Sequence, residues 1–156
     1  MTANTLVAPE AVSDKTLAAF PARRKARKRA VDVLYEAEQR DEPIMRVLSE
    51  RQQLAARDPQ MPGIPEYAAT LVEGVADHLD EVDDAIAASL KGWQLDRVAA
   101  VDRNILRVAA FELRYREDVD TPVAISEAIK IAEVLCADDS PAFINGVLQS
   151  VATAGG

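Results

Sequence analysis

Residues 96–116 read D-R-V-A-A-V-D-R-N-I-L-R-V-A-A-F-E-L-R-Y-R, and this stretch decides the fold class. Its apolar side chains recur at steps of three and four, which is the spacing of one face of an α-helix. They are Val98, Val101, Ile105, Val108 and Ala109. Asp96 stands where its carboxylate can cap the first turn. The pattern therefore predicts an amphipathic helix from about Asp96 to about Arg116.

Glu112 falls inside the apolar arc of this helix. A buried carboxylate without a partner is strongly destabilising, because it leaves water without regaining its hydrogen bonds. We therefore expect an arginine or a backbone donor beside Glu112. A structural ion pair of this kind explains the residue better than a role as a catalytic acid.

Helical signals continue on both sides of this stretch. The same period predicts helices over residues 23–39, 44–56, 122–136 and 141–152, and two helices within 66–90 that are separated by a break near 78–80. Thr121 and Ser140 each place a capping hydroxyl before a proline at the first helical position. No segment alternates with the period of a strand. The chain is therefore predicted to be all-α, with about seven helices in one domain over 23–156, after a flexible tail at 1–22.

The composition excludes several classes of protein. The chain has 156 residues with a single cysteine, Cys136, and a single histidine, His78, so neither a disulfide framework nor a metal site is expected. No apolar run is long enough to span a membrane, and residues 1–24 lack the order of a signal peptide. No nucleophile motif or glycine-rich phosphate loop is present. We therefore expect a cytoplasmic protein that is not an enzyme, with no cofactor and no catalytic residue.

The charge is distributed very unevenly along the chain. Residues 23–29 read R-R-K-A-R-K-R and carry six positive charges, whereas the whole chain has a net charge of −8. The rest of the chain therefore carries −14. This asymmetry indicates two partners of opposite sign: a polyanion at the basic block and a basic protein at the acidic body.

Helical geometry predicts where the basic block points. With Ala26 as the origin, Arg24, Tyr35 and Lys28 fall at about 160°, 180° and 200°, opposite the apolar face. An exposed aromatic ring aligned with cations suits single-stranded RNA, because the cations contact phosphates while the ring stacks on a base. The alternative is a solvated helix face with Tyr35 packed against the tail.

Residues 138–148, D-D-S-P-A-F-I-N-G-V-L, form the second informative segment. Phe143 lies roughly 90° from the centre of the inward face, so we expect it to be half exposed beside Asp138 and Asp139, at a helix start that could join an RNA or partner surface. The alternative is that Phe143 flanks the core. Gly146, inside this helix, is expected to permit the close approach of another helix.

Three segments together resemble the NusB family of transcription antitermination factors. They are residues 23–35, R-R-K-A-R-K-R-A-V-D-V-L-Y; residues 93–115, W-Q-L-D-R-V-A-A-V-D-R-N-I-L-R-V-A-A-F-E-L-R-Y; and residues 122–148, which end in S-P-A-F-I-N-G-V-L. The resemblance covers roughly 23–151. It implies two three-helix bundles that share a long helix, and an arginine-rich helix that binds boxA RNA of ribosomal operon leaders.

The resemblance also implies partners and site residues. The partner is NusE, a small-subunit ribosomal protein, recruited with this RNA to RNA polymerase; a homodimer is also compatible with the family. The implied RNA-binding residues are Arg23, Arg24, Lys25 and Arg27 of the basic motif, Tyr35 as its aromatic, and Asp139 and Phe143 at the C-terminal surface. Asp102 falls on an acidic position that faces NusE. Ser126, Glu133 and Cys136 depart from the family pattern, where Asn, Lys and Gly are usual.

Two other functions remain open from the sequence. A similar domain is fused to some ribosomal RNA cytosine methyltransferases, so the chain could be the RNA-binding half of such a system. It could also be a helical adaptor or homodimer without any role in RNA binding.

Overall fold

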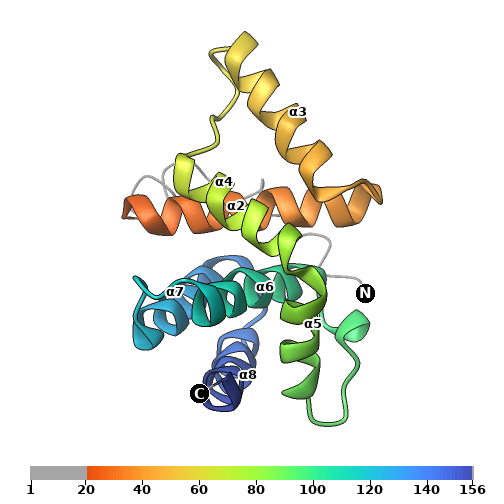
Figure 1. Cartoon of the computed structure of the whole chain (residues 1–156), viewed down its shortest axis with the longest axis vertical. Helices are drawn as coiled ribbons and strands as arrows, with labels where there is room; N and C mark the ends of the chain where they lie inside the picture. Colours follow the sequence, from red (N-terminus) through yellow and green to blue (C-terminus); the bar gives the residue numbers. More distant parts are fainter. Residues whose placement is uncertain (1–20, 156) are drawn as a thin grey trace.

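The computed structural model describes residues 21–155, which fold into seven α-helices and one short 3-10 helix (Figure 1). The elements are α2 (Ala22–Arg40), α3 (Ile44–Arg57), α4 (Glu66–Asp77), α5 (Leu79–Ala88), η3 (Leu95–Arg97), α6 (Ala100–Tyr115), α7 (Thr121–Leu135) and α8 (Ser140–Gly155). No strand occurs within 21–155. The predicted all-α class is therefore confirmed.

The helices form two groups that meet at α6. Helices α2, α3 and α4 pack on one another, while α7 and α8 pack together against α6, with α5 beside α6 and α8. Helix α6 also contacts α2 and α4, so it lies at the centre of the molecule. Figure 1 shows α2 to α4 in the upper half and α5 to α8 in the lower half. The predicted helix over 96–116 is thus the element that holds both groups.

Most predicted helix ends agree with the structure to within two residues. Helix α2 stops at Asp41, whose left-handed backbone (φ 52°) directs its N–H back to the carbonyl groups of Ala37 and Glu38. The predicted break near 78–80 is also confirmed, because α4 ends at Asp77 and α5 begins at Leu79. The predicted tail falls almost wholly within residues 1–20, outside the described part of the chain.

The predicted capping of α6 by Asp96 is wrong. Asp96 lies in η3, and α6 begins at Ala100 after two extended residues, with no side-chain cap. Arg103 explains the separate segment, because its guanidinium donates to the carbonyl oxygens of Leu95 and Val98 and so satisfies the groups that would otherwise continue a helix. Thr121 is likewise not a cap but the first residue of α7.

Two glycines have opposite surroundings. A Cβ atom at Gly74 of α4 would lie 2.1 Å from Cζ of Phe111 on α6, so the absence of a side chain there allows these helices to approach. A Cβ atom at Gly146 of α8 would meet nothing within 4 Å. The prediction that Gly146 permits a close helix contact is therefore wrong, and Gly74 serves that purpose.

Two features are absent from the described residues. No helix within 21–155 combines the length and the apolar character needed to cross a bilayer. The same residues contain no group of three His, Cys, Asp or Glu side chains placed to hold a metal ion.

Candidate nucleic-acid interface

The basic block occupies the N-terminal half of α2, and its six cations differ widely in exposure. Arg23 and Lys25 are exposed, and Arg24 and Arg29 are half-buried. Arg27 and Lys28 are 4% and 3% exposed. The block is therefore not a uniformly solvated face but a set of side chains held at different depths.

The prediction that Arg24, Lys28 and Tyr35 form an exposed stripe is wrong. Lys28 is buried, with its Nζ 3.0 Å from Asp32 one turn later, and Tyr35 is half-buried against the core. The apolar face of α2 is wider than the sequence indicated, because Val31 is buried as well. Helix α2 packs against α3, α4, α6 and α7, so little of its circumference is left for solvent. The role of these residues in RNA binding stays a prediction.

Arg27 and Glu112 form the buried ion pair that the sequence predicted. Nε of Arg27 lies 3.0 Å from both carboxylate oxygens of Glu112, which is fully buried. The Tyr67 hydroxyl of α4 donates a short hydrogen bond to the same carboxylate. The pKa of Tyr67 is raised to about 12, mainly by burial and then by the hydrogen bond to Glu112 and the charge of Glu112. This cluster fixes the basic end of α2 to both α4 and α6.

Arg24 pairs with Glu127 of α7 in a two-point contact. Its Nε and Nη2 lie 2.8 and 2.9 Å from the two carboxylate oxygens. The hydrogen bonds from Arg24 hold the pKa of Glu127 below its usual value, and the same hydrogen bonds raise the pKa of Arg24. Arg27 lies 3.6 Å from the same carboxylate. Glu127 therefore neutralises part of the block that RNA would contact.

The free positive charge of the block is much smaller than its sequence suggests. Four carboxylates pair with it, namely Asp32, Glu112, Asp118 and Glu127. Two of these carboxylates, Asp118 and Glu127, also pair with Arg116 and Lys130, so among the described residues they neutralise only part of the block. Lys25 forms no ion pair with any residue that the structure describes, and it is exposed.

Tyr67 and Arg116 adjoin the block although neither belongs to it. The guanidinium carbon of Arg23 lies 3.9 Å from the centre of the Tyr67 ring, and that of Arg116 lies 5.4 Å from it. These distances are typical of cation–π contacts. Sequence reasoning missed both residues, because Tyr67 fits the apolar spacing of its own helix and nothing local links it to residues far along the chain.

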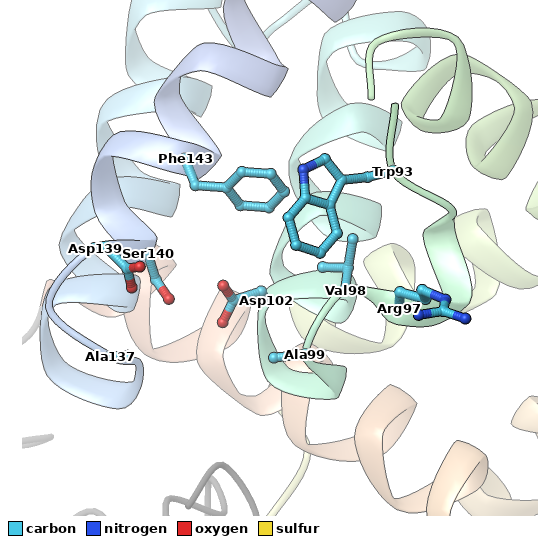
Figure 2. A pocket seen from close by; sticks show the side chains of 9 residues that line it. All are labelled: Trp93, Arg97, Val98, Ala99, Asp102, Ala137, Asp139, Ser140 and Phe143. Atoms are coloured by element: carbon cyan, nitrogen blue, oxygen red, sulfur yellow. The ribbon is translucent and has the colours of Figure 1, made fainter. Parts of the chain in front are cut away.

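A second group of predicted residues lies around a cavity of about 350 Å³ between the start of α6 and the start of α8 (Figure 2). It brings Asp139 and Phe143, which the resemblance assigned to RNA, together with Asp102, which it assigned to NusE. Phe143 is half-buried, in agreement with the prediction. In Figure 2 its ring points toward the indole of Trp93, which is 60% exposed. Trp93 had no predicted role, although a single tryptophan after a glycine in a loop is a usable signal.

Asp102 lies deeper than a residue on an interface rim. It is 7% exposed and stands in the first turn of α6, where the helix dipole favours a carboxylate. Burial, and then the charge and a hydrogen bond of Asp102, raise the pKa of the Cys136 thiol. A partner can therefore reach Asp102 only through the cavity.

The two groups of residues lie at opposite ends of the α2–α6 pair. Arg27 contacts Glu112, whereas Glu38 contacts Asn104, so the helices run antiparallel. Arg27 and Glu38 are 11 positions apart, which is about 16 Å along α2. The basic block and the cavity are therefore separate surfaces.

Comparison with known proteins finds a matching family and relatives over most of the chain. The NusB family profile matches residues 24–153. Transcription antitermination protein NusB of Salinispora arenicola is 51% identical over 134 residues, covering 85% of this chain and 96% of the relative.

Solved structures share the fold. T. maritima NusB matches with a TM-score of 0.73 and 33% identity, covering 85% of this chain and 92% of that chain. The antitermination factors NusB and NusE in complex with dsRNA provide a second match, with a TM-score of 0.71 and 26% identity, covering 85% of this chain and 96% of that chain.

Proposed function

The chain belongs to the NusB family, and from this premise we propose that it is a transcription antitermination factor. It binds boxA-type single-stranded RNA of ribosomal operon leaders together with NusE. The pair then joins the elongating RNA polymerase in the cytoplasm. The chain acts by binding and not by catalysis.

The observation that carries this proposal is the family match over the same residues that form the basic block, α6 and α8. A related protein has been solved with NusE and dsRNA, and it shares this fold. The exposed cations Arg23 and Lys25 supply phosphate contacts, and the cavity with Trp93 and Phe143 supplies aromatic surface. Asp102 and Asp139 outnumber Arg97 in the lining of that cavity, which suits a basic partner such as a ribosomal protein.

The test is binding of a fluorescent boxA-like single strand, measured with and without NusE. We expect weak binding alone, because carboxylates pair with much of the block and the chain as a whole carries −8. Binding should tighten when NusE is present. A scrambled strand and a duplex of the same sequence are the control probes. Equal affinities for all probes, with and without NusE, would contradict the proposal.

A pair of variants separates this surface from a general charge effect. Lys25→Gln removes an exposed cation of the block, and Arg57→Gln removes an exposed cation at the end of α3. Lys25→Gln should reduce the slope of log affinity against log salt by about 0.7, the value for one phosphate contact to a single strand. Arg57→Gln should leave the slope unchanged.

A further inference from the structure

We propose that Arg23 and Arg116, both set against the ring of Tyr67, form a binding site for one phosphate of the RNA backbone. In the free chain the carboxylate of Asp118 occupies this site. The inference rests on the proposed RNA-binding function and adds to it three residues outside the basic block. When RNA binds, one of its phosphates replaces the carboxylate of Asp118.

The site is assembled from three helices. Arg23 comes from α2, Tyr67 from α4, and Arg116 from the residue that directly follows α6. The hydroxyl of Tyr67 is anchored on the buried carboxylate of Glu112, so its ring is held in place. Arg23 lies 3.9 Å from the ring centre and its side chain remains 50% exposed. Tyr67 therefore orients a guanidinium that still faces solvent.

Asp118 lies between the two arginines. Its Oδ2 accepts a hydrogen bond from Nη2 of Arg116 at 3.0 Å and lies 3.8 Å from Nη2 of Arg23. A phosphodiester group carries the same unit charge on two terminal oxygens, so it can replace this carboxylate. Arginine pairs are well suited to bind such a group at two points.

Arg116 retains an unused donor at this place. Its Nε is buried and makes no hydrogen bond. A buried donor without an acceptor is costly, and Asp118 does not relieve it. A phosphate between Arg23 and Arg116 brings a further acceptor to the same guanidinium. The site is thus incompletely satisfied in the free chain.

Little interaction free energy is lost when a phosphate displaces Asp118. Displacing Asp118 breaks two contacts on an exposed side chain: one of 3.8 Å to Arg23, and the 3.0 Å hydrogen bond from Arg116, whose side chain is 28% exposed. Exposed pairs of this kind contribute little to stability. Arg24 and Glu127, by contrast, are mostly buried and joined at two points. RNA therefore displaces Asp118 and leaves Glu127 in place.

The first experiment measures affinity for the boxA-like strand over a range of salt concentrations in two matched variants. Arg116→Gln removes a cation of the site, and Arg114→Gln removes an exposed cation two residues earlier, in the last turn of α6. Arg116→Gln should lower the salt slope by about 0.7, as expected for one lost phosphate contact. Arg23→Gln combined with Arg116→Gln should lower it no further, because both residues hold one phosphate. Equal effects of Arg114→Gln and Arg116→Gln would overturn the proposal.

The second experiment removes the competing carboxylate. Asp118→Ala should raise RNA affinity about two- to fivefold, the range that an exposed ion pair represents. Asp120→Ala removes the same charge from the same loop, and Asp120 forms no ion pair within the described part of the chain. It should change affinity much less. Equal increases would mean that only net charge matters, and would overturn the assignment of Asp118. Thermal melting by circular dichroism verifies that each variant is folded.

A third measurement separates this inference from the proposed function. In the wild-type chain, inorganic phosphate should shift the NMR signal of the Arg116 Nε–H group, and Arg23→Gln should weaken that shift. A shift in a chain that binds no RNA would support the site and contradict the proposed function. Absence of the shift in such a chain would overturn the site as well. If the chain binds RNA, the salt slopes and affinities of the variants above determine whether this phosphate site exists.

Discussion

Glu112 shows how one residue connects stability with the candidate interface. It is fully buried on α6, yet its two partners, Arg27 and Tyr67, belong to the surface that carries the cations. A buried carboxylate of this kind is tolerated only while its donors remain. The position of the basic end of α2 therefore depends on a side chain that RNA cannot reach.

Glu112→Gln is expected to destabilise the chain by roughly 3 to 5 kcal/mol, because it leaves the buried Arg27 without its main counter-ion. Urea denaturation measures the loss. Glu117→Gln is the control, since Glu117 is an exposed residue with no ion pair in the described part of the chain. It should change stability by less than about 0.5 kcal/mol. A similar small change for both variants would show that Arg27 is held by Glu127 instead.

The surroundings of some residues could be predicted from the sequence, and those of others could not. Glu112 could be placed because its own helix showed an apolar arc around it, which requires a partner. Lys28 and Tyr35 could not, because a helical wheel gives directions around one helix and not the positions of α3 and α4 around it. Tyr67 and Arg116 escaped notice for the same reason, since their significance arises only from tertiary contacts.

Helices α4 and α6 illustrate packing that a single side chain would prevent. The ring of Phe111 fills the space where a Cβ atom of Gly74 would stand. This contact lies at the junction of the two helix groups. His78, directly after α4, stacks on Tyr115 with ring centres 4.0 Å apart and extends the same aromatic cluster.

Gly74→Ala is expected to destabilise the chain by about 1 to 3 kcal/mol, the usual cost of overpacking. Gly146→Ala should have the opposite sign, with a gain of up to about 1 kcal/mol, because alanine favours a helix and nothing obstructs it. Thermal unfolding of the two variants compares them directly. A gain in both would mean that Phe111 moves aside without loss.

The sequence predicted helix boundaries best where a residue changes the backbone at its own position. Asp41 and the prolines near helix starts marked most helix boundaries correctly, since they change the backbone at their own position. Asp96 failed as a marker because Arg103, eight residues beyond Leu95, binds the carbonyl groups of that segment. A cap signal in the sequence around Asp96 does not reveal the contacts of Arg103, which comes from the following helix, α6.

The two helix groups are joined by ion pairs as well as by apolar contacts. Arg24 and Glu127 link α2 to α7. Glu38 of α2 binds Arg103 and Arg107 of α6, and Arg107 also donates to Asp83 of α5. These ion pairs therefore connect α2 with α6 and α7, and α6 with α5.

Glu127 provides a test with a defined sign. Its pKa is lower in the folded chain than in the unfolded chain, so the unfolded state binds more protons in this range. Its contribution is therefore present above the unfolded value near 4.5 and is lost as the pH falls through the folded value. Arg24→Gln should lower stability at pH 7 by about 1.5 to 3 kcal/mol, as for hydrogen bonds to charged groups. The stabilities of wild type and variant should converge as the pH falls below the pKa of Glu127 in the folded chain; parallel curves would contradict this assignment.

The pairing of Arg27 with Glu112 has a consequence for how such a chain can diverge. The two residues are 85 positions apart, yet either one without the other leaves a buried charge. A substitution at one position is therefore tolerated only with a compensating change at the other. Among distant relatives, we expect these two columns of an alignment to vary together, whereas the column of the unpaired Lys25 should vary only as its contact with RNA permits.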